Sequence, residues 1–78
     1  MKFGIIILNS KGVVVDKIVV NSDNYALALL DAEKVFLSKY PEFEFSDSGM
    51  FIGSNERDLT VENKNSLEEE YYKLKIVE

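Results

Sequence analysis

The reactive side chains in this sequence are carboxylates, lysines, tyrosines and serines, because the 78 residues include no histidine and no cysteine. Histidine is the commonest general base near neutral pH, and cysteine supplies the thiol nucleophile. These two residue types also supply most zinc ligands. A Ser-His-Asp triad cannot form, so we predict that the chain is not an enzyme and uses no cofactor.

Paired carboxylates are the remaining candidates for catalysis, because two of them can hydrolyse a glycosidic bond. They occur at Glu42 and Glu44 and in the run 68–70. A glycosidase also needs a cleft that holds a sugar, and a chain of this length has little room for one. We interpret Glu42 and Glu44 as the solvent side of a strand and the run as a helix start, and we predict no catalytic residue.

Metal and phosphate sites are not predicted either. The nearest acidic cluster for calcium, Asp47-Ser48-Gly49, lacks the alternating ligands and the final glutamate of an EF-hand loop. The glycines of segment 49–53 are not followed by the lysine and hydroxyl residue of a phosphate-binding loop. Turn chemistry explains both segments.

The net charge of −5 is unevenly distributed along the chain. Residues 1–40 have a charge balance of +1, whereas residues 41–78 have a balance of −6. A negative field repels nucleic acids and anionic membranes and attracts basic protein surfaces. The simpler interpretation is an acidic surface that only keeps the protein in solution.

We predict that the acidic half binds a protein partner with a basic surface. The predicted partner-binding residues are Glu42, Glu44, Glu68, Glu69, Glu70, Tyr71 and Tyr72. The glutamates would supply negative charge, and the tyrosines would serve as amphipathic anchors. Such an array could occupy a nucleic-acid-binding groove, as a stoichiometric inhibitor or regulator does. Direct nucleic-acid binding is not predicted, because glutamates stand where single-strand-binding platforms place lysine and arginine.

A small α+β fold would position these residues. Apolar segments 2–9 and 13–20, joined by the turn Asn9-Ser10-Lys11-Gly12, predict an N-terminal β-hairpin that is apolar on both faces. Asn21 or Ser22 is the expected N-cap of the helix that follows.

That helix is predicted over residues 23–40, because Pro41 disfavours helical geometry in the residue before it. Further short strands are expected at 42–45, 50–52 and 59–61, with Phe43, Phe45, Leu59 and Val61 pointing inward. The helix should therefore pack on a small antiparallel sheet.

The C-terminal segment has two interpretations. Ser66 and Glu69 form a capping box, and lysines at 73 and 75 suit a helix C-terminus, so we predict a C-terminal helix. The alternative is a strand over 72–77 with Tyr72, Leu74 and Ile76 pointing inward.

The predicted long helix is apolar over a wider arc than one sheet contact needs. Its main face comprises Tyr25, Ala28, Leu29, Ala32, Val35, Phe36 and Tyr40. Ala26, Leu30 and Leu37 extend this face, with Glu33 among them. These three residues either contact the C-terminal segment or form a homodimer seam, so a homodimeric structural or regulatory domain is the alternative function.

Length and composition predict one domain, 1–78. The lack of cysteine fits a reducing, cytoplasmic location. No signal peptide is evident, and no segment approaches the ~20 apolar residues of a membrane span. No family motif can be matched residue by residue. In size and charge alone, the chain is similar to small acidic phage-encoded inhibitors of host defence enzymes, anti-CRISPR proteins included, which implies the nucleic-acid-mimicking role described above.

Overall fold

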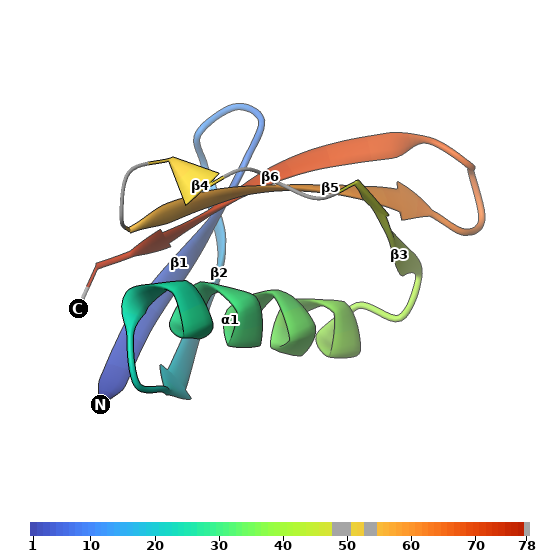
Figure 1. The fold of residues 1–78 in the computed structure, drawn as a ribbon. Helices are drawn as coiled ribbons and strands as arrows, with labels where there is room; N and C mark the ends of the chain where they lie inside the picture. The colour runs from blue at the N-terminus through green and yellow to red at the C-terminus, as the bar shows by residue number, and fades with distance from the viewer. Residues whose placement is uncertain (48–50, 53–54, 78) are drawn as a thin grey trace.

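The computed structural model describes residues 1–47, 51–52 and 55–77, with one helix packed on an antiparallel sheet (Figure 1). The strands are β1 (Lys2–Asn9), β2 (Val14–Asn21), β3 (Phe43–Asp47), β4 (Phe51–Ile52), β5 (Glu56–Asn63) and β6 (Glu69–Ile76), and the helix is α1 (Tyr25–Lys39). The strand order is β2-β1-β6-β5-β3, and β4 also pairs with β5. The predicted α+β class is confirmed.

The predicted N-terminal hairpin forms, with its second strand displaced by one residue to 14–21. The Asn9 side-chain oxygen accepts the backbone N–H groups of Lys11 at 2.9 Å and Val13 at 3.0 Å, which closes the turn. Gly12 has a φ of +78°, a left-handed conformation that glycine adopts without strain. The register between β1 and β2 shifts after Ile7, where a bulge bends the edge strand.

Helix α1 begins two residues later than predicted, with Asn24 as its N-cap. The Asn24 side chain accepts the N–H of Leu27 at 2.9 Å. The two predicted caps have other roles: Asn21 is the last residue of β2, and the Ser22 hydroxyl donates to the Asp31 carboxylate. Strand β2 therefore includes Asn21, and the helix is capped by Asn24 instead.

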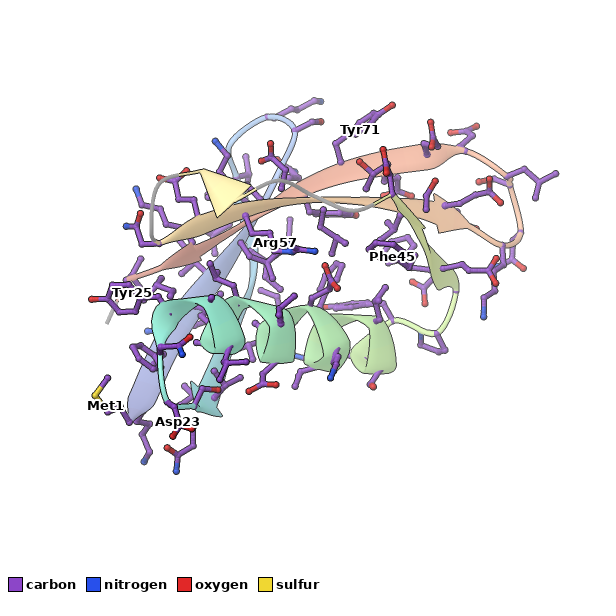
Figure 2. All side chains as sticks on the ribbon, viewed as in Figure 1. Met1, Asp23, Tyr25, Phe45, Arg57 and Tyr71 are labelled. Carbon is purple, nitrogen blue, oxygen red and sulfur yellow. The ribbon has the colours of Figure 1, made fainter. Side chains whose placement is uncertain are left out.

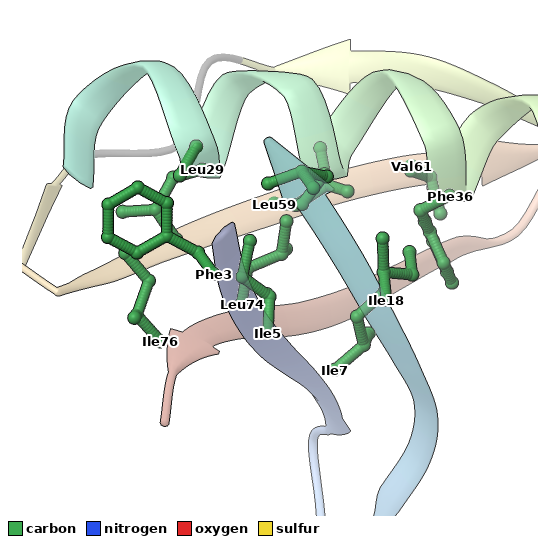
Figure 3. Close-up of a cluster of buried hydrophobic side chains, with 13 residues drawn as sticks. Phe3, Ile5, Ile7, Ile18, Leu29, Phe36, Leu59, Val61, Leu74 and Ile76 are labelled. Atoms are coloured by element: carbon green, nitrogen blue, oxygen red, sulfur yellow. The ribbon is translucent and has the colours of Figure 1, made fainter. Parts of the chain in front are cut away.

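The core lies between α1 and the facing side of the sheet (Figure 3). Its buried members are Phe3, Ile5, Ile7, Ile18, Val20, Ala28, Leu29, Ala32, Phe36, Leu59, Val61, Leu74 and Ile76. Each long strand contributes alternate residues, as a sheet covered on one face requires. On the predicted helix face, Tyr25 and Val35 are exposed, because they lie at the borders of the buried stripe.

The C-terminal segment is the strand β6, so the predicted helix is wrong and the alternative is correct. β6 pairs with β1 on one edge and with β5 on the other. Leu74 and Ile76 are buried and Tyr72 packs against the core, as the strand alternative requires. A capping box contributes about 1 kcal/mol, which is little against two ladders of backbone hydrogen bonds.

Of the expected capping box, Ser66 lies in the β5–β6 turn and Glu69 is the first residue of β6. The Asn63 side-chain oxygen accepts the N–H groups of Asn65 at 2.9 Å and Ser66 at 3.3 Å. Leu67 has a positive φ of 61° within this turn. The Ser66 hydroxyl accepts the N–H of Glu68 at 3.4 Å, so the serine acts in a turn and not at a helix start.

A buried ion pair joins the helix to β5. The Arg57 Nε donates to Glu33 Oε1 at 3.2 Å, and Arg57 is only 7% exposed. Figure 2 shows Arg57 pointing into the space between sheet and helix. Arg57 lies outside the strands that the sequence predicts, whereas in the structure it is an inward-facing residue of β5. The pair also explains the glutamate within the apolar arc of the helix, because a buried charge needs a partner.

A second polar cluster ties the end of α1 to the edge strand. Asp16 accepts the Tyr40 hydroxyl at 3.0 Å and lies 2.7 Å from Lys39 Nζ. Its other oxygen accepts the backbone N–H of Lys17 at 2.7 Å. The hydrogen bond from Lys39 is the main reason that the pKa of Asp16 lies below its ordinary value of 3.8.

The first prediction concerns this cluster. Because the folded-state pKa of Asp16 is lowered, its carboxylate stabilises the fold above pH 3.8, and this contribution is lost as the pH falls through the folded-state pKa. Asp16→Asn should therefore lower the free energy of unfolding most near neutral pH, and the difference from wild type should shrink in acid. Urea denaturation across a pH series measures this. Lys39→Met should act in the same direction, and profiles unchanged by both substitutions would contradict the assignment.

The second prediction concerns the central strand. Leu74 is fully buried, so Leu74→Ala should lower the free energy of unfolding by about 2–5 kcal/mol through lost burial and the cavity left behind. Leu27→Ala is the matched control, because Leu27 is 43% exposed on α1 and its truncation should change stability by less than about 0.5 kcal/mol. Guanidinium denaturation measures both. Equal losses would mean that β6 is not central to the core.

Candidate functional site

The sheet has a face opposite α1 that we call the open face, because no described element covers it (Figure 1). Strand alternation decides which side chains reach it. On β6, Tyr72, Leu74 and Ile76 point toward the helix, so Glu69, Tyr71, Lys73 and Lys75 point to the open face. Figure 2 shows Tyr71 directed away from the helix, and it is 56% exposed.

Three glutamates lie side by side at one end of the open face. Glu44 of β3 is the register partner of Glu62 of β5, and Glu62 is the register partner of Glu69 of β6. Neighbouring strands are about 4.8 Å apart, so the three backbones hold these carboxylates in a line across the sheet. We call Glu44, Glu62 and Glu69 the acidic row. The Ser46 hydroxyl donates to Glu69 Oε2 at 2.9 Å.

The structure separates the glutamates that the sequence grouped together. Glu44 and Glu69 belong to the acidic row, whereas Glu42 precedes β3 and Glu68 lies in the β5–β6 turn. Glu70 points to the helix side of β6, where it accepts the Tyr72 hydroxyl at 2.7 Å. The run of three glutamates is therefore divided by strand alternation, which directs consecutive side chains to opposite faces.

Glu62 is the acidic-row residue that sequence reasoning missed. The strand predicted at 59–61 ends one residue before it, whereas β5 continues to Asn63. Alternation from the inward Leu59 and Val61 would have placed Glu62 on the outer face had the strand been extended. The signal was present, but strand ends are the least certain part of a pattern-based prediction.

The two predicted tyrosine anchors occupy different environments. The Tyr72 ring lies 5.1 Å from Phe36 and 5.9 Å from Phe43, within an aromatic cluster that also includes Tyr40. Burial, followed by the hydrogen bond to the Glu70 carboxylate, raises the pKa of the Tyr72 hydroxyl. Tyr72 therefore contributes to packing between Phe36 of α1 and Phe43 of β3. Tyr71 is the tyrosine that a partner on the open face would contact.

A shallow pocket of about 360 Å³ lies beside Tyr71. Its open-face lining includes Leu8, Asp58, Thr60 and Lys73. Lys73 Nζ lies 3.5 Å from a carboxylate oxygen of Glu56, so its charge is partly compensated. This hollow has the mixed polar and apolar lining of a contact surface, and Tyr71 forms its exposed wall.

The candidate dimer seam of the helix is not uniform in depth. Leu37 packs against the core, Leu30 is half-buried and Ala26 is exposed. The C-terminal segment is the central strand β6, and α1 packs against it. A dimer through this seam stays a prediction.

Within the described residues, no group of three or more acidic side chains is arranged to hold a metal ion. In the same part of the chain, no helix is long and apolar enough to cross a membrane. Of the expected turn Asp47-Ser48-Gly49, the structure describes only Asp47, as the last residue of β3, and Met50 also lies outside the described residues. In comparisons with known proteins, no family model, no curated protein and no solved structure matches this chain.

Proposed function

We propose that the chain is a protein-binding module that inhibits or regulates a nucleic-acid-binding partner by occupying its basic surface. The observation that carries this proposal is the acidic row of Glu44, Glu62 and Glu69. A line of carboxylates at interstrand spacing presents concentrated negative charge to lysine- and arginine-rich surfaces.

The arrangement of the row favours a binding role over simple solubility. Like charges directly opposite each other in a sheet are destabilising. A surface that only has to be soluble does best with charges of both signs interspersed. Here two successive register pairs, Glu44 with Glu62 and Glu62 with Glu69, place like charges together. Folding therefore works against mutual repulsion that a basic partner would relieve.

The strands also limit the conformational cost of binding. The row lies on paired strands, and Glu69 is held by the Ser46 hydroxyl at 2.9 Å. Side chains that are already restrained lose less entropy when a partner binds them. Tyr71 follows Glu69 by two residues on the same face of β6, so an aromatic contact stands next to the charge.

The third prediction tests the acidic row with a charge reversal at its centre. The wild-type chain, immobilised, should retain nucleic-acid-binding proteins from a lysate of the source organism, and duplex DNA or raised salt should elute them. Glu62→Lys should abolish this retention, because it removes the middle charge and adds a repulsive one. Mass spectrometry of the eluted proteins measures the outcome.

Asp23→Lys is the matched control for that experiment. It makes the same change in net charge at an exposed residue before α1, away from the row, and should retain the same proteins. Circular dichroism should show that both variants fold. Retention that survives Glu62→Lys, or that neither salt nor duplex DNA reverses, would rule out the proposed function.

A further inference from the structure

The other side of the open face differs in character from the acidic row. Register pairs place Lys17, Ile6 and Lys75 in one line across β2, β1 and β6, and Val14, Leu8 and Lys73 in the next. Val19, opposite Gly4, extends the surface and is 60% exposed. We call these seven side chains, Ile6, Leu8, Val14, Lys17, Val19, Lys73 and Lys75, the basic-apolar patch.

The patch combines apolar area with positive charge: Val14 and Val19 are exposed, and Ile6 and Leu8 are half-buried. Branched side chains exposed together on neighbouring strands mark an interaction site more often than scattered ones do. Among the residues that the structure describes, neither Lys17 nor Lys75 takes part in an ion pair. The whole chain has a net charge of −5, so these two lysines differ from most of its charged surface.

We propose that the basic-apolar patch binds an amphipathic helix with acidic flanks, presented by a partner protein. Three adjacent strands span about 10 Å from the first to the last, which matches the ~10–12 Å diameter of an α-helix. The apolar stripe of that helix would cover Ile6, Leu8 and Val19. Its carboxylates would reach Lys17 on one side and Lys75 on the other.

An added β-strand suits this region less well than a helix. The apolar residues lie on two strands and in three register lines, so an extended segment along one edge would leave most of them uncovered. The free edge of β2 is also partly blocked, because the N–H of Lys17 is bonded to the Asp16 carboxylate at 2.7 Å. Edge strands commonly avoid unwanted pairing through such charged residues and bulges.

Charge disfavours two other occupants. A flat anionic membrane laid against the open face would also meet the acidic row, because Glu62 and Glu69 lie on that face. A second copy docked through the same patch would bring the lysines of both copies into one interface. A helix is narrow enough to cover β2, β1 and β6 without reaching the row.

The fourth prediction uses a defined probe, a fluorescein-labelled synthetic helix of about 18 residues, ~27 Å long. Leucines at i, i+3, i+4 and i+7 would form its apolar stripe, with glutamates flanking them. Fluorescence anisotropy should show saturable binding to the wild-type chain. Lys17→Glu should weaken binding by about tenfold, and Lys34→Glu on the outer side of α1 should change it by less than about twofold.

A second matched pair tests the apolar part of the patch. Val19→Asp should weaken binding of the same probe, whereas Val35→Asp, on the exposed border of α1, should not. Circular dichroism and thermal unfolding check that each variant folds. Because these variants leave the acidic row intact, retention of nucleic-acid-binding proteins should persist, so the two proposals can fail separately.

Four outcomes would overturn the inference. The first is no binding of the acidic helix by wild type. The second is equal binding of a sequence-scrambled peptide or of a version with lysines in place of the glutamates. The third is flotation of the chain with phosphatidylserine-containing vesicles that Lys17→Glu abolishes. The fourth is a dimer in sedimentation velocity that Val19→Asp dissolves, which would assign the patch to a second copy.

Discussion

The pairing of β6 on both of its edges is the constraint on which the rest of the structure depends. β1 comes from the start of the chain and β5 from its second half, and β6 is the described strand that joins them. The buried side chains of Leu74 and Ile76 complete the core from this central position. A helix at the C-terminus would leave the N-terminal hairpin and the β5 ladder as separate edges with unpaired backbone groups, which would be costly under a packed helix.

One helix cannot cover a sheet on both faces, and this asymmetry produces the open face. α1 buries the inward-facing side chains of the sheet. The buried Arg57–Glu33 pair and the Asp16 cluster fix the position of the helix at two points. Such polar ties contribute orientation more than stability, because desolvation offsets much of their attraction. The outward-facing side chains are not constrained by a core, so their charge differs along the sheet. Carboxylates lie at the β3–β5–β6 end, and lysines lie among valines and an isoleucine at the β2–β1 side.

The two surfaces divide the open face by charge. The acidic row and the basic-apolar patch share β6, which contributes Glu69 to one and Lys75 to the other. Lys73, which belongs to the patch, is paired with Glu56 of β5. A face with opposite signs at its two ends orients a bound partner, because the wrong orientation brings like charges together.

Local periodicity and turn chemistry decide several features of this fold, so the sequence by itself determined them. These features are the α+β class, the hairpin with its glycine turn, the helix that ends before Pro41, and the inward positions of Leu59 and Val61. The sequence also excluded histidine and cysteine chemistry. The tertiary structure alone decided that the last segment is a strand, since its capping signal is weaker than pairing with two distant strands. The tertiary structure also decided which glutamates lie together. Register depends on contacts between remote segments, and it aligned Glu44, Glu62 and Glu69 and placed Glu70 on the inward face.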